Sequence, residues 1–239
     1  MTIIELGDPA LEPVPLGLER RVTLGGSHDA PDEQHDRISL GRPVCVALDP
    51  ATVDAEAQAF LQGKIGSAFC LLALVCSFRA DDDAPIDQAW IEVRLEAAGG
   101  GGATAPLAWS MEPLSVTDLV QVSQVAKLDA SLKLKSDTVP IELGPSASKE
   151  TTREFAQRVP YIEAHREGTS RPSWIFTRTP ITEVRGVHRL RTVVQLVAGT
   201  TGRAEISAGA TLRLKRLGLI PYRAKLRDLP EQQSVVLGT

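Results

Sequence analysis

The sequence predicts an all-β protein with minor helix content, folded as an antiparallel β-sandwich or a barrel-like sheet. Two runs, Ala126–Leu134 and Ala204–Leu214, alternate apolar and polar residues at every position. Side chains of a strand point to opposite faces with a period of two, so each run is typical of a half-buried strand. Turn residues recur at short intervals, and strands do not alternate with helices. We therefore expect roughly eight to ten strands and one helix near residues 50–62.

The first 40 residues predict an extended N-terminal arm followed by a polar loop. Pro9, Pro13 and Pro15 exclude helix from the arm, because proline restricts its own backbone and that of the preceding residue. Residues 25–39 are rich in Gly, Asp and His and predict a loop. We expect the arm, Met1–Leu18, to be able to add a strand to the exposed sheet edge of a neighbour.

One helix is predicted directly after a short strand at residues 44–48. Asp49 is placed to cap this helix, Pro50 occupies its first position, and Gly63 ends it. An apolar stripe along the helix is formed by Val53, Ala57, Phe60 and Leu61.

The most hydrophobic stretch, Ala68–Phe78, predicts a central strand that is covered on both faces. A turn over Asp81–Pro85 leads into a second strand, Gln88–Ala97, whose odd-numbered residues are apolar. Two strands joined by a tight turn predict a β-hairpin.

The middle of the chain begins with a loop signal, the four glycines at Gly99–Gly102. A strand at Leu107–Met111 and a short helix or turn near Ser115–Val122 are predicted next. The alternating run Ala126–Leu134 then predicts the first arm of a hairpin. Its partner strand is either Val139–Leu143 or Thr152–Ile162.

Further strands are predicted at Trp174–Thr177, Val187–Val197 and Arg203–Leu214, and the last two are joined by five residues that include two glycines. Residues 221–239 carry alternating charge and predict an extended tail. The expected organisation is an arm and loop at 1–40, a β-sandwich at 41–220 and a tail at 221–239. Two half-sandwiches split near 99–122 are the alternative.

Charge is distributed unevenly along the chain. Residues 1–120 hold 7 Lys and Arg against 19 Asp and Glu, whereas residues 121–239 hold 19 against 11. This asymmetry favours an anionic partner for the basic half, or two halves that face each other within or between molecules. An ordinary solvated surface is the third explanation.

The three cysteines, Cys45, Cys70 and Cys76, are an odd number, and residues 1–18 lack the positive and apolar segments of a signal peptide. We therefore expect thiols, a reducing compartment and a cytoplasmic location. Cys70 and Cys76 lie on one parity of an apolar strand, which predicts buried side chains without a catalytic role.

Motifs for catalysis and metal binding are weak. Ser146–Lys149 matches the Ser-x-x-Lys pattern of acyl-transferring enzymes, but the helix and the later Lys-Thr-Gly of that class are missing. His28 and His35 lie in a polar loop, which favours solvation over a zinc or nickel site. His188 on an apolar strand predicts a partly buried, hydrogen-bonded imidazole. The acidic turn at 81–83 lacks the ligand spacing of a calcium loop.

We therefore expect no cofactor, no metal and no small-molecule ligand. The sequence favours a protein without catalytic activity, and an enzyme with a site assembled from separate strands is an alternative. Nucleic acid is a disfavoured partner, because the basic strands carry no aromatic residues for base stacking and the net charge is −4.

A membrane-binding or pore-forming β protein is a further alternative. Residues 126–164 predict long amphipathic strands rich in Ser, Thr and Lys. A strand that crosses a bilayer needs about 9–11 alternating residues, a length that Ala126–Leu134 just reaches. A soluble sandwich needs the same alternation, so the pattern does not separate the two.

The main prediction is a non-catalytic protein-interaction or assembly module of an intracellular bacterial multi-protein system, with a protein partner or self-association. Basic residues on outer strand faces are expected to meet an acidic turn, and salt is expected to weaken this association. An anionic membrane is the alternative partner. The predicted interaction residues are Lys127, Lys133, Lys135, Arg213, Lys215 and Arg216, with Asp81, Asp82 and Asp83 on the acidic side.

Overall fold

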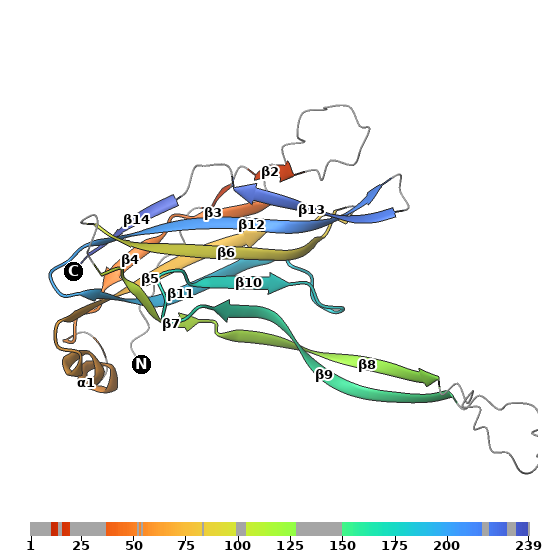
Figure 1. The fold of residues 1–239 in the computed structure, drawn as a ribbon, viewed down its shortest axis with the longest axis horizontal. Helices are drawn as coiled ribbons and strands as arrows, with labels where there is room; N and C mark the ends of the chain where they lie inside the picture. The colour runs from red at the N-terminus through yellow and green to blue at the C-terminus, as the bar shows by residue number, and fades with distance from the viewer. Residues whose placement is uncertain are drawn as a thin grey trace, which may run out of the picture.

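The computed structural model shows two antiparallel β-sheets packed face to face, with one helix among the residues that it describes (Figure 1). Strands make up 64% of the structure. The predicted antiparallel β-sandwich with a single helix is confirmed, although the sheets, with six and eight strands, hold more strands than expected. The described residues are 11–13, 16–19, 37–51, 53, 55–82, 84–98, 104–127, 150–216, 220–228 and 233–238.

The six-stranded sheet has the order β1-β3-β5-β11-β7, and β4 also pairs with β5. β5 lies at its centre, as its apolar sequence predicted. The strands are β1 (Leu11–Pro13), β3 (Ile38–Gly41), β4 (Val44–Ala47), β5 (Ser67–Phe78), β7 (Leu107–Glu112) and β11 (Gly186–Val197).

The eight-stranded sheet has the order β2-β13-β12-β6-β10-β9-β8, and β14 also pairs with β12. The segment predicted as a tail, 221–239, therefore contributes strands to this sheet. The strands are β2 (Leu16–Glu19), β6 (Ile86–Ala97), β8 (Ser115–Lys127), β9 (Glu150–His165), β10 (Ser173–Thr177), β12 (Gly202–Arg216), β13 (Ile220–Asp228) and β14 (Gln233–Leu237).

The hairpin predicted between residues 68–78 and 88–97 was wrong. β5 and β6 belong to different sheets, and β11 and β12 are separated in the same way. Each of these strands has one strongly apolar face, and packing that face against the opposite sheet buries it as well as a hairpin would. Alternation therefore predicts the strand but leaves its pairing partner open.

Arg37 stabilises the connection in which the chain crosses from β5 in one sheet to β6 in the other. Its guanidinium donates hydrogen bonds to the carbonyl oxygens of Arg79, at 3.2 Å, and of Ala84, at 2.7 Å. The Asp81 carboxylate lies 3.8 Å away. Arg37 is 4% exposed, and its burial lowers the pKa of the guanidinium. The connection between the sheets is thus fastened by a buried cation.

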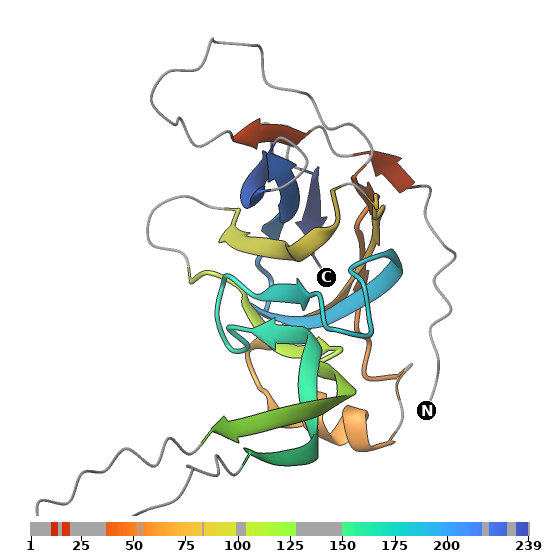
Figure 2. The same ribbon diagram turned by 90° about the vertical axis from the view of Figure 1, so that its right-hand side faces the viewer.

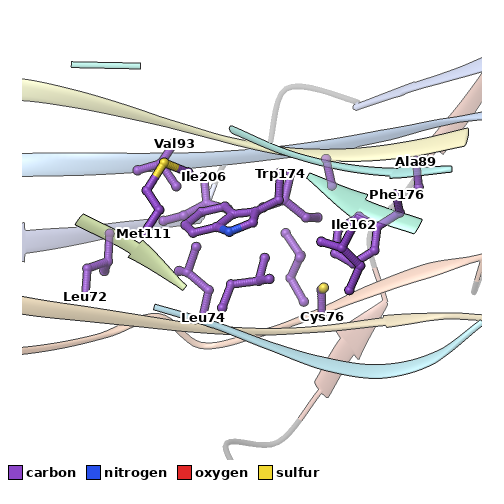
Figure 3. Close-up of a cluster of buried hydrophobic side chains, with 14 of the residues drawn as sticks. Leu72, Leu74, Cys76, Ala89, Val93, Met111, Ile162, Trp174, Phe176 and Ile206 are labelled. Carbon is purple, nitrogen blue, oxygen red and sulfur yellow. The ribbon is translucent and has the colours of Figure 1, made fainter. Parts of the chain in front are cut away.

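The core lies between the two sheets (Figure 3). Leu72 and Leu74 of β5 face the eight-stranded sheet, and Val93 of β6 and Ile206 of β12 face back. The fully buried Trp174 of β10 lies across the middle of this cluster. Few aromatic residues are needed, because aliphatic side chains from both sheets fill most of the space.

The helix, α1 (Ala55–Gly63), begins later than the predicted start at Pro50. The Asp49 carboxylate accepts a hydrogen bond from the backbone N–H of Ala51, at 2.8 Å, so Asp49 caps a turn ahead of the helix. In the described part of the chain, no helix has the length and apolar character to cross a membrane.

The short helix or turn predicted near Ser115–Val122 was also wrong, because this segment is part of β8. Val116, Val120 and Val122 recur at even positions, which suits a strand, and β8 pairs along its whole length with β9. The local signals of this segment were mixed, and its pairing with the distant β9 stabilises it as a strand.

Candidate functional site

β8 and β9 form a two-stranded hairpin that projects from the sandwich (Figure 1). Within the described residues, β8 pairs with no strand except β9, and β9 pairs with β10 only from Ile162 to His165. From Asp118↔Val159 to Lys127↔Glu150, ten consecutive residue pairs therefore have no further strand on either side. This projecting part is called the hairpin arm below.

Thr152–Ile162, one of the two predicted partners of the run Ala126–Leu134, pairs instead with residues 116–125, and Ala126 and Lys127 lie opposite Thr151 and Glu150. Residues 128–149, which hold most of the run Ala126–Leu134 and the other proposed partner, Val139–Leu143, lie outside the described residues.

A β-bulge at the root of the hairpin turns Tyr161 into the sandwich. Val116 lies opposite Ile162 and Thr117 opposite Pro160, which leaves Tyr161 as the extra residue. Bulges re-aim side chains, and Tyr161 is 7% exposed. Its hydroxyl donates a hydrogen bond to the Glu183 carbonyl oxygen at 3.2 Å, and burial raises the pKa of the phenol.

His188 of β11 lies beside this tyrosine, with its Nε2 atom 3.5 Å from the Tyr161 hydroxyl. The Nε2–H donates a hydrogen bond to the Arg185 carbonyl oxygen at 3.1 Å. The imidazole also contacts the rings of Phe78 and Phe176, at centroid distances of 5.7 and 4.9 Å. Burial lowers the pKa of His188, and the predicted half-buried, hydrogen-bonded imidazole is what the structure shows.

Two more hydrogen bonds fasten the root. The Thr179 hydroxyl donates to the Asp118 carboxylate, which ties the start of the hairpin arm to the connection between β10 and β11. The indole N–H of Trp174 donates to the Pro113 carbonyl oxygen at 3.2 Å, just before β8 begins. The hairpin is thus anchored at its base, while its arm extends beyond these contacts.

The base of the hairpin also presents apolar side chains to solvent. Leu114 is 58% exposed, Val116 41% and Leu119 60%, whereas the neighbouring Val120 is buried. Apolar residues exposed on a two-stranded ribbon gain nothing from the sandwich core, so they mark a surface suited to an apolar partner.

Among the described residues, the predicted interaction residues are spread over β8, β12 and the turn at 81–82. Lys127 ends β8 opposite Glu150, whereas Lys133, Lys135 and Asp83 lie outside the described residues. The backbones of Lys215 and Arg216 lie in β12, paired with β13, and Asp82 is exposed in a turn.

Two of these residues already have partners within the molecule. The Arg213 guanidinium lies 2.9 Å from the Asp87 carboxylate, and Asp81 lies 3.8 Å from Arg37. Asp87 is the extra residue of a bulge between β6 and β12, which places it beside Arg213. Contacts of the predicted set between protomers stay a prediction.

The cysteines are free thiols, and Cys70 and Cys76 are buried as expected. Burial raises the pKa of Cys76, and a hydrogen bond between Cys45 and Cys70, together with burial, raises that of Cys70. Within the described ranges, no three His, Cys, Asp or Glu side chains are grouped as metal ligands.

Sequence reasoning missed two residues that shape this site, Tyr161 and Asp118. Neither belongs to a motif. Tyr161 follows Pro160, and a proline inside a strand is a signal for a bulge. Pro160 was therefore the sequence signal that could have located the bulge at the root of the hairpin.

Comparison with known proteins gives structural likenesses alone. No protein-family model and no curated protein sequence matches the chain. Solved structures that resemble it include the Clostridium perfringens NetB toxin in its membrane-inserted form, with 7% identity, coverage of 95% of this chain and 94% of that chain, and a TM-score of 0.31.

A structure described as a pore forming protein has 6% identity, coverage of 92% and 94%, and a TM-score of 0.29. The Clostridium perfringens delta-toxin has 6% identity, coverage of 83% and 82%, and a TM-score of 0.29. Against these findings, two expectations were wrong: the assembly module and the cytoplasmic location. At such TM-scores the likeness carries no mechanism, so the proposal below rests on the hairpin itself.

Proposed function

We propose that this protein binds membranes and forms pores, and that the hairpin arm is the part that crosses the bilayer. The observation that carries this proposal is its length. Ten consecutive pairs extend from Asp118↔Val159 to Lys127↔Glu150 without a strand on either side. A tilted strand that crosses the hydrocarbon core needs about 9–11 residues, so each arm strand has the required length.

The alternation of the sequence supports the same role. In β8 the even positions hold Val120, Val122, Gln124 and Ala126, the odd positions hold Gln121, Ser123, Val125 and Lys127, and strict alternation begins at Ala126. The same parity continues in the sequence through residue 134. An inserted strand needs an apolar face toward lipid and a polar face toward water.

Insertion also requires self-association. The backbone groups along both edges of a lone hairpin would lack hydrogen-bond partners in lipid, where each such group costs several kcal/mol. Pairing with the hairpins of other copies satisfies these edges. We therefore propose an oligomer on an anionic membrane. Lys127, Lys133 and Lys135 share the polar parity of the strand, and in the oligomer they would face the aqueous pore.

A matched pair of lysine substitutions tests the proposal. Val122→Lys places a charge at an even, apolar position in the middle of the hairpin arm, and Ser123→Lys places the same charge at the adjacent odd, polar position. Lysine on the lipid face costs about 2–4 kcal/mol at the middle of the bilayer, so we expect Val122→Lys to reduce dye release from anionic vesicles by at least about 30-fold. Ser123→Lys should release dye like the wild type. Equal release by the two variants, or no release by the wild type, would contradict the proposal.

A further inference from the structure

A second exposed apolar surface lies away from the hairpin, on α1 and β7. It consists of Phe60, Ile65, Leu107 and Trp109, which are 36%, 97%, 38% and 40% exposed, and it is called the α1–β7 patch below. The rings of Phe60 and Trp109 lie 5.3 Å apart, and both contact the buried ring of Phe69, at 5.7 and 6.2 Å. The exposed rings of Phe60 and Trp109 therefore pack on the buried ring of Phe69.

A β-bulge directs Trp109 to this surface. Ser110 lies opposite Val193 and Ala108 opposite Val194, so Trp109 is the extra residue. The indole thus points onto α1 while the residues on either side of it stay in register with β11. A bulge that re-aims a tryptophan into solvent does not serve the core.

Ile65 is the most exposed part of the patch. It lies in the turn between α1 and β5, beside Gly66 with a positive φ of 81°. The N–H of Lys64 donates to the Leu61 carbonyl oxygen at 3.2 Å, and the N–H of Ser67 donates to the Lys64 carbonyl oxygen at 3.0 Å. These bonds fix the turn and hold the isoleucine side chain in water.

A cation lies on the aromatic surface. The Lys64 ammonium is 4.6 Å from the centre of the Trp109 ring and 5.7 Å from that of Phe60. Lysine and tryptophan are the residues that anchor proteins at the headgroup level, where the ring lies among lipid chains and the charge meets phosphate. The charge of Lys64 is complementary to an anionic headgroup.

The position of the patch fits the same partner as the hairpin. α1, β7 and the hairpin lie on the lower side of the sandwich in both views, with α1 at one end of the long axis and the hairpin arm projecting from the other (Figures 1 and 2). β7 leads into β8 through two residues, so the patch and the root of the hairpin are joined by continuous chain.

We propose that the α1–β7 patch docks the protein onto the headgroup region of an anionic bilayer, with Ile65 and Trp109 inserted and Lys64 against phosphate. This inference rests on the proposed function, since it names the surface that holds the protein on the membrane before the hairpin inserts. Docking and insertion use different residues, and experiments can separate them.

The first experiment measures flotation of the full chain with 1:1 phosphatidylcholine–phosphatidylglycerol vesicles. Ile65→Ser should weaken binding about 10-fold, because one exposed isoleucine loses its transfer to lipid. Val236→Ser is the matched control: Val236 is 71% exposed on β14, outside the patch, and its substitution should leave binding unchanged. Lys64→Gln should weaken binding about five-fold on these vesicles and little on pure phosphatidylcholine.

Tryptophan fluorescence gives a second readout. Trp109 emission should shift to shorter wavelength on the vesicles. Trp109→Phe should abolish the shift, because Trp174 is buried and the partly buried Trp90 lies on β6, outside the patch. Unchanged binding by both Ile65→Ser and Lys64→Gln would overturn the docking proposal. So would a loss of self-association without lipid, which would identify the patch as an interface between copies.

The two proposals fail in different ways. Weaker vesicle binding by Ile65→Ser, in a wild type that binds but releases no dye, would support docking and contradict the pore. Dye release that is blocked by Val122→Lys but unaffected by Ile65→Ser and Lys64→Gln would support the pore and overturn docking.

Discussion

The sandwich body and the hairpin arm are built from the same alternation of apolar and polar residues, but the alternation meets different surroundings. In the body, Leu190 of β11 and Val93 of β6 are fully buried between the two sheets. In the hairpin, Leu119 of β8 is 60% exposed and lies on the face opposite to Val120, and within the described residues no third strand pairs with the arm. A period of two therefore predicts a strand with one apolar face, and it does not predict whether protein or lipid will cover that face.

A matched pair of leucine truncations gives the largest expected difference. Leu190→Ala should lower the free energy of unfolding by about 2–5 kcal/mol, because it leaves a cavity in the core. Leu119→Ala should change it by less than about 0.5 kcal/mol. Chemical denaturation measures both values. A similar loss for the two variants would mean that the hairpin is part of the folded core in solution, and the comparison would fail.

A matched pair of arginines gives the next largest difference and tests what fastens the sheets of the body together. Arg37→Leu should cost about 2 kcal/mol, because two carbonyl oxygens at the crossing from β5 to β6 lose their donor. Arg94→Leu is the control, since Arg94 is half exposed and pairs with Glu96 on its own strand at 2.9 Å. That surface pair is worth at most about 1 kcal/mol. Equal losses would argue against a special role for the buried cation.

The smallest expected effect concerns pH at the root, where hairpin and body meet. Burial lowers the pKa of His188 below its unfolded value of 6.5, so the unfolded chain binds more protons over the range between the two values. The stability contributed by the neutral imidazole is present above pH 6.5 and is lost as the pH falls through that range. His188→Gln should remove this part of the pH dependence. Identical slopes of stability against pH for wild type and variant would contradict the assignment.

The sequence predicted the strands of the body well, for a physical reason. β6 and β12 bury alternate residues against the opposite sheet, and this burial requires apolar residues at alternate positions of the sequence. Their pairing was not predictable, because a strand joined to its predecessor by a short turn can pair with it or cross to the other sheet. For this reason the predicted hairpin of β5 and β6 was wrong.

The hairpin was predicted in part. Residues 152–162 were one of two expected partners for the run that begins at Ala126, but they pair with residues 116–125 instead. The amphipathic pattern was recognised as compatible with lipid. The segment Ser115–Val122 was misassigned, because its local signals are weak and β9, which stabilises it as a strand, is distant in sequence. Tyr161 and Trp109 were missed, since their roles depend on bulges that composition does not reveal.

The most direct test of the central claim, that the hairpin enters lipid while the body does not, is a fluorescence scan with an environment-sensitive dye on single cysteines. In a Cys45→Ser background, where Cys70 and Cys76 are buried, the dye is placed in the hairpin arm at Val122→Cys, Ser123→Cys, Ala126→Cys and Lys127→Cys. We expect anionic vesicles to raise the emission at 122 and 126, to leave it low at 123 and 127, and not to change it at Val236→Cys in the body. Emission that rises at none of these hairpin positions, or equally at all of them, would contradict insertion of the hairpin arm.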